Sequence, residues 1–174
     1  MVNVIFIDDN YLYQNFPLPK RLDRAQLLSI IQLEQFTSIQ DLLGSCLYEH
    51  IEDKVLNQTL SGSEVDLYKL LKYALAMFSA KATVSMLRTA AAGTKNEESV
   101  QDQYVIDALV SQIESKAKYI NTKIINYIKN DTDLYAITQA EGCKVDDVFQ
   151  EDDVYQGSVY YPNTLYRNEE NCDN

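Results

Sequence analysis

The segment 31-IQLEQFTSIQDLLGSCLYEHI-51 determines most of what the sequence predicts about the fold. Thr37 to Gln40 has the residue types of an N-terminal capping box, so we predict a helix that begins near residue 37. Gly44 would lie inside this helix, where glycine costs about 1 kcal/mol relative to alanine. We therefore predict a close helix–helix contact at Gly44, beside Leu43 and Leu47. Apolar side chains recur through the segment at helical spacing: Ile39, Leu42, Leu43, Cys46, Leu47, Ile51 and Val55.

The sequence on both sides of this segment predicts further helices. Asp23 has the position of a capping residue for a short helix that follows it. Two apolar series between residues 64 and 92 predict a central helix that is covered on more than one side. A long amphipathic helix is expected over about 95–130 and a short one over 133–140. The fold class is therefore mostly α, a bundle of four or five helices.

The two ends of the chain predict extended arms. The first twenty residues alternate weakly and reach Pro17 and Pro19, which disfavour helix in the residues before them. Near the other end, strand-forming residues are interrupted by Gly157 and Pro162. We therefore expect an N-terminal arm over 1–20, a helical domain over 21–140 and an acidic, tyrosine-rich C-terminal arm over 141–174.

The net charge of −11 on 174 residues is unevenly distributed. Residues 1–130 hold 15 acidic and 13 basic side chains, whereas residues 131–174 hold 11 and 2. This balance argues against a general nucleic-acid binder, which would carry a basic patch. Acidic residues mixed with tyrosine and valine favour a docking segment over a solvating tail, which stays the alternative. The interface candidates are Tyr155, Tyr160, Tyr161, Tyr166, Asp152 and Asp153.

Residues that carry chemistry are few. The three cysteines, 97 and 29 residues apart, indicate neither a disulfide framework nor a zinc site, and we interpret them as reduced thiols. His50 is the one histidine, and its expected neighbour is Asp53 on the same helix face. Glycine-rich phosphate loops and the GxSxG motif do not occur. The sequence thus predicts no catalytic, cofactor-binding or metal-binding residues, and a protein that is not an enzyme.

Neither a membrane span nor a signal peptide is expected. The longest run without a charged residue has 13 residues, from Val154 to Tyr166, and it is polar. A transmembrane helix needs about 20 mostly apolar residues. The first ten residues contain two aspartates and no basic residue, unlike a secretory signal.

The segment 31–51 also resembles the head–tail connector (adaptor) proteins of tailed bacteriophages, especially small ring proteins of the crAss-like phages of Bacteroides. The resemblance covers about residues 4–130 and is carried by Ile31, Gln35, Ile39, Leu43, Gly44, Leu47, Tyr48 and Ile51. Phe6 to Asp9 and Tyr68 to Ala76 also match the family in character. The C-terminal arm has no counterpart in the resemblance.

The resemblance implies a nonenzymatic virion protein, assembled in the host cytoplasm and located at the portal–tail junction. Its expected partners are copies of itself in a ring, usually twelvefold, together with the portal protein, the tail and neighbouring ring proteins. Genomic DNA would pass nearby without specific binding, and no membrane or cofactor is implied. The alternative from the residues alone is a small acidic binding module, or a DNA mimic that inhibits a basic host protein.

Overall fold

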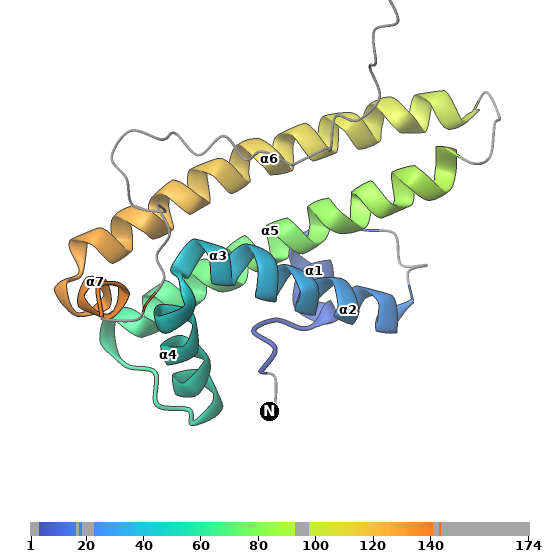
Figure 1. Ribbon diagram of the computed structural model, residues 1–174. Coiled ribbons are helices and arrows are strands. Elements are labelled where there is room, and N and C mark those ends of the chain that lie inside the picture. Colours follow the sequence, from blue (N-terminus) through green and yellow to red (C-terminus); the bar gives the residue numbers. More distant parts are fainter. Residues whose placement is uncertain (1–3, 17, 19–22, 93–97, 141–142, 144–174) are drawn as a thin grey trace, which may run out of the picture.

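Helix α5 (Gly62–Ala92) is the centre of the fold and packs against the long helix α6 (Glu98–Asn130). Figure 1 shows these two helices side by side, with the remaining helices gathered along the other side and one end of α5. This computed structural model describes residues 4–16, 18, 23–92, 98–140 and 143. The mostly helical fold class is confirmed, and the described residues contain no strand.

The core runs along α5, which was predicted to be covered on more than one side. Leu67, Leu71, Leu75 and Met77 are fully buried. Helices α1 (Asp9–Asn15), α2 (Arg24–Glu34) and α6 all contact α5, as does the π-helical turn η1 (Gln35–Ile39). Lys81 on α5 also pairs with Glu114 on α6 at 3.0 Å. The apolar series of α5 therefore reflects contacts with elements on both sides.

The boundary predicted near residue 37 is wrong, and the chain is helical through it. After α2 and η1 the helix continues as α3 (Gln40–Leu43). The Thr37 hydroxyl donates to the Leu33 carbonyl at 2.9 Å, and the Ser38 hydroxyl donates to the Glu34 carboxylate at 2.6 Å. These hydroxyls bond backward along the helix and so do not cap a new one.

The helix ends instead at Gly44, which we had placed inside it. Gly44 has φ 73° and ψ 159° and separates α3 from α4 (Ser45–Leu56). This backbone conformation is essentially restricted to glycine. Gly44 is buried, and the adjacent Leu43 and Leu47 are fully buried. The backbone conformation itself therefore explains the glycine, and the close helix–helix contact at Gly44 stays a prediction.

The N-terminal segment is part of the helical body, contrary to the extended arm predicted over 1–20. It contains α1, whose first turn is capped by the Asp8 side chain accepting from the Tyr11 amide at 2.8 Å. Phe6, Ile7, Leu12 and Leu18 are buried in the common core. Burial of these side chains stabilises a helix too short to form alone.

Cys46 and Cys143 form a disulfide bond, which corrects the interpretation of the cysteines as reduced thiols. The bond joins the start of α4 to the residue that lies beyond the short helix α7 (Thr132–Thr138). A spacing of 97 residues carried no sign of this pairing, because the two cysteines meet only through the packing of α7 beside α4.

By length and composition alone, Gly62–Leu87 of α5 is apolar enough to cross a membrane, with a mean hydropathy of 1.2. From the longest run without a charged residue, which has 13 residues, we had predicted no membrane-spanning helix. Half of its most apolar window is buried inside the protein. Because the core helix of a folded protein passes the same test, this property is weak evidence for a membrane span.

Candidate functional site

The side chain of Gln35, in η1, fixes the N-terminal segment to the helical body. Its amide nitrogen donates to the Val4 carbonyl at 2.7 Å and lies 3.0 Å from the Tyr48 hydroxyl. Its amide oxygen accepts from the backbone N–H of Phe6 at 2.8 Å. Gln35 is itself buried. A buried polar group requires hydrogen-bond partners, and Gln35 finds all of the partners described here within the fold.

Aromatic rings complete this junction. The Phe6 ring lies 5.8 Å from that of Tyr48 and 5.4 Å from that of Tyr68, and the Tyr68 hydroxyl donates to the Phe6 carbonyl at 3.1 Å. The Lys72 ammonium lies over the rings of Tyr68 and Tyr11. Burial raises the pKa of Tyr48 and Tyr68, so both hydroxyls stay protonated near neutral pH.

Beside this junction lies a surface depression that we call the α4 groove. It encloses about 540 Å³ between the N-terminal segment, η1 and α4. Its apolar walls include Val4, Ile5, Phe36 and Leu56, and its acidic residues are Glu49 and Glu52. Phe36 is 67% exposed and Leu56 is 51% exposed. No lysine or arginine of the described residues lines it. The groove is thus both apolar and acidic.

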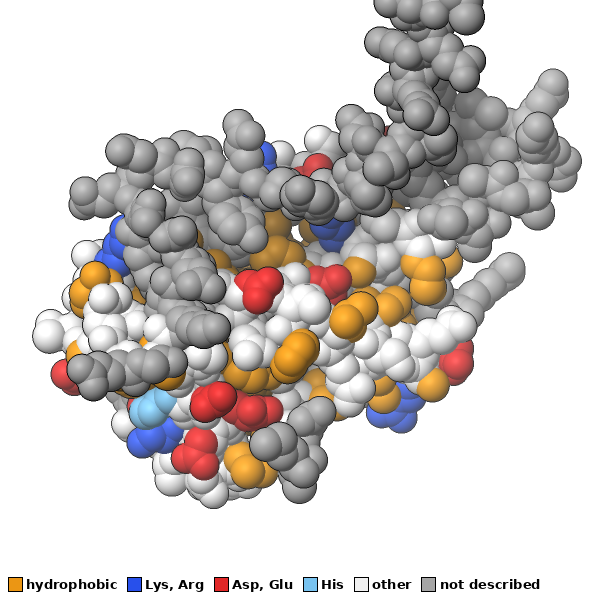
Figure 2. Space-filling model, viewed as in Figure 1, with side chains coloured by type: hydrophobic (Ala, Val, Ile, Leu, Met, Phe, Trp, Pro, Cys, Tyr) orange, Lys and Arg blue, Asp and Glu red, His pale blue; other side chains and the backbone are white. Residues whose placement is uncertain are grey.

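Figure 2 shows acidic and apolar side chains together at the end of the molecule that carries the histidine, which is His50 of α4. Leu33, on α2, is a further exposed apolar side chain. A monomeric protein rarely leaves contiguous large apolar side chains uncovered. This face is therefore the strongest candidate for a contact surface.

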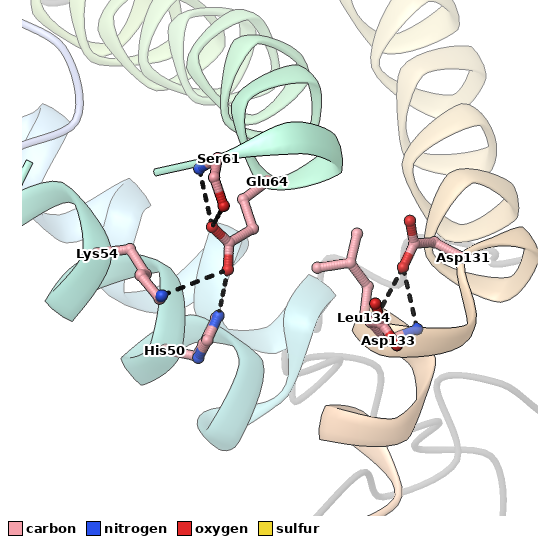
Figure 3. A network of polar contacts seen from close by, with 7 residues as sticks. All are labelled: His50, Lys54, Ser61, Glu64, Asp131, Asp133 and Leu134. Atoms are coloured by element: carbon pink, nitrogen blue, oxygen red, sulfur yellow. Dashed lines mark hydrogen bonds and ion pairs between the residues drawn. The ribbon is translucent and has the colours of Figure 1, made fainter. Parts of the chain in front are cut away.

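His50 pairs with Glu64 and not with Asp53 as expected. Figure 3 shows the Glu64 carboxylate at the start of α5, with the His50 ring nitrogen 2.7 Å away and the Lys54 ammonium 4.0 Å away. The Ser61 amide donates to the other carboxylate oxygen at 3.0 Å. Burial tends to raise the pKa of Glu64, but these hydrogen bonds and charges outweigh it and the pKa is lowered.

The second cluster in Figure 3 caps α7. Asp131 accepts from the backbone amides of Leu134 at 2.9 Å and Asp133 at 3.1 Å. The bond from Leu134, followed by one from the Ser63 side chain, lowers the pKa of Asp131. Since both clusters hold helix ends together, their chemistry is structural. Among the described residues, no three His, Cys, Asp or Glu side chains are grouped to hold a metal ion.

The interface candidates of the C-terminal arm lie outside the described residues. These are Tyr155, Tyr160, Tyr161, Tyr166, Asp152 and Asp153. The α4 groove, in contrast, was not predicted. A sequence signal was available, because Phe36 and Leu33 are apolar residues that fall away from the buried stripe of Ile31, Gln35 and Ile39.

Comparisons of this chain with protein-family models, curated proteins and solved structures find no match.

Proposed function

We propose that the chain is a structural virion protein, a head–tail connector subunit that forms a ring between the portal and the tail of a phage. The observation that carries the proposal is a helical body that exposes large apolar side chains on its surface. Phe36 and Leu56 are exposed in the α4 groove, Leu33 is exposed on α2 and Tyr119 is exposed on α6. Neighbouring subunits in a ring would cover such side chains.

The resemblance over residues 4–130 supports the choice of a connector among structural proteins. The charge of the chain is compatible with a ring through which DNA passes. A net charge of −11 would keep a DNA duplex from adhering to the ring, because basic walls bind DNA tightly through counterion release. The described polar clusters also give little support to a catalytic function, since Gln35, Glu64 and Asp131 form hydrogen bonds that stabilise the fold.

The second candidate is a small acidic binding module or a DNA mimic that inhibits a basic host protein. It is favoured by the concentration of acidic residues in 141–174, where nine acidic and two basic side chains give a net charge of −7. This module would act through its C-terminal arm and would not need the exposed groove.

Locating the protein in particles tests the connector proposal. Virus particles purified from the source of this chain would be labelled with a gold-conjugated antibody against it. We expect the label at the vertex where the tail joins the head. A protein found only in the infected cell, bound to a basic host protein, would contradict the connector and support the second candidate.

A truncation tests the role of the arm in the connector. Removal of residues 144–174 retains Cys143 and hence the disulfide bond. For a connector whose arm reaches adjacent subunits, we expect the truncated chain to remain helical by circular dichroism but to be lost from particles. Normal incorporation and infectivity would show that the arm is a solubility appendage.

A further inference from the structure

The outer surface of α6 carries a stripe that we call the α6 ridge, formed by Lys116, Tyr119 and Lys123. Spacings of three and seven residues place these side chains on one face of a helix with 3.6 residues per turn. Tyr119 is 70% exposed, the highest value among the large hydrophobic side chains of the described residues. Both lysines are exposed as well. The ridge is thus a basic surface with an aromatic ring at its centre.

The ridge is free of negative charge. Within the stretch 112–126, the exposed residues that share its side of the helix are Gln112, Ser115, Thr122 and Asn126. The carboxylate of Glu114 lies on the other flank of α6 and pairs with Lys81. Neither Lys116 nor Lys123 forms an ion pair within the described part of the chain. Two positive charges therefore face outward on either side of an exposed tyrosine.

The α4 groove has the complementary properties. It combines an apolar cavity of about 540 Å³ with the carboxylates of Glu49 and Glu52. Neither carboxylate pairs with a cation in the described structure. Opposite charge around a matching apolar contact is the arrangement that selects and orients a partner.

We infer that the α4 groove of one copy of this chain binds the α6 ridge of a second copy. The Tyr119 ring of the second copy enters the cavity beside Phe36 and Leu56, where its apolar body is buried and its hydroxyl stays near water. The flanking ammonium groups of Lys116 and Lys123 reach Glu49 and Glu52 on flexible stems. This inference rests on the proposed function and names the contact between ring neighbours.

The fold keeps the two surfaces apart within one chain. The groove is built from the N-terminal segment, η1 and α4, whereas α6 packs on the other long side of α5 (Figure 1). A chain therefore cannot fill its own groove with its own ridge. Contact between two different surfaces is heterologous, and its repetition produces a ring or an open filament.

Charge reversal of each surface, separately and together, tests the inference. The association of the full chain would be measured by sedimentation velocity and native mass spectrometry. The groove variant is E49K/E52K and the ridge variant is K116E/K123E. We expect each to associate about tenfold or more weakly than the wild type, because like charges would face each other. The quadruple variant, which exchanges the two signs and restores the net charge of −11, should recover association.

A matched control uses Lys118, an exposed lysine on the opposite flank of α6. K118E should associate like the wild type. Y119S, which removes the ring but no charge, should weaken association as the ridge variant does. Glu52 is half-buried and the other substituted side chains are exposed, and circular dichroism would verify that each variant retains its helical fold.

Three results would overturn the inference. They are a wild-type chain that stays monomeric at all accessible concentrations, reversals that change nothing, and a quadruple variant that is folded but does not recover. These results would leave the connector proposal standing if the antibody still labels the portal vertex, since the ring would then use other surfaces. Association that persists with no label on particles would refute the connector and leave the contact intact.

Discussion

Replacing Gln35 by methionine should destabilise the protein far more than the same replacement at Gln40, five residues along the chain. Gln35 is buried and bonds to the Phe6 amide, the Val4 carbonyl and the Tyr48 hydroxyl. The side-chain oxygen of Gln40, in contrast, is buried without a hydrogen-bond partner. Methionine has a similar unbranched shape, so the two variants differ mainly in the hydrogen bonds that they remove.

The expected magnitudes follow from these contacts. A net hydrogen bond contributes about 0.5–1.5 kcal/mol, and an amide left buried without a partner costs about 1–3 kcal/mol. Losing the bonds to Val4 and Tyr48 and leaving the Phe6 amide unpaired should therefore lower the free energy of unfolding by about 2–6 kcal/mol in Gln35→Met. Gln40→Met removes a buried acceptor that forms no hydrogen bond, so the free energy of unfolding of this variant should equal or exceed that of the wild type.

Urea denaturation followed by circular dichroism measures both free energies. Hydrogen exchange adds a local measurement, since the Phe6 amide should exchange faster than in the wild type in Gln35→Met and at the wild-type rate in Gln40→Met. Equal destabilisation of the two variants would refute the reasoning, because it would mean that the bonds of Gln35 contribute nothing beyond the packing of its side chain.

Three further predictions concern the backbone, the disulfide bond and the pH dependence. Gly44→Ala should lower the free energy of unfolding by about 1–3 kcal/mol, because φ 73° with ψ 159° strains any residue with a Cβ; an unchanged thermal melting temperature would contradict this. A reductant should lower the stability of the wild type by about 2–4 kcal/mol but should not affect Cys46→Ser, which lacks the bond between Cys46 and Cys143. The pKa of Glu64 lies below its ordinary value of 4.5, so its contribution to stability is present above about pH 4.5 and is lost as the pH falls through the lowered pKa. Glu64→Gln should accordingly flatten the stability profile in that acidic range, and a profile as steep as that of the wild type would show that other carboxylates dominate it.

The long helices could be predicted from the sequence, whereas the joints between elements could not. Periodicity over thirty residues identified α5 and α6, because many side chains repeat the same signal. The break near Thr37 was misplaced because serine and threonine are found both at helix caps and bonded backward within a helix. Helix α1 was missed because a helix of seven residues depends on tertiary burial, here of Leu12, more than on its own sequence.

The functional surfaces were harder to predict than the fold, for a related reason. The α4 groove joins Ile5, Phe36 and Leu56, which are distant in sequence and come together only when Gln35 anchors the N-terminal segment. The α6 ridge is local, and its spacing was visible in the sequence. The sequence alone does not distinguish it from a solvated helix face, and the exposure of Tyr119 does.

The residues that carry the resemblance to connector proteins have a structural explanation. Ile31, Ile39, Leu43, Leu47 and Ile51 are fully buried in the core. Gln35 and Gly44 of the same pattern serve the fold as well. Gln35 forms hydrogen bonds to the N-terminal segment, and Gly44 adopts the positive φ that separates α3 from α4. The pattern therefore specifies how the helices meet, and a fold can be shared by proteins of different function. Evidence for the connector proposal must therefore come from the location of the protein in particles, whereas charge reversals at the groove and the ridge test the proposed contact without altering the buried core.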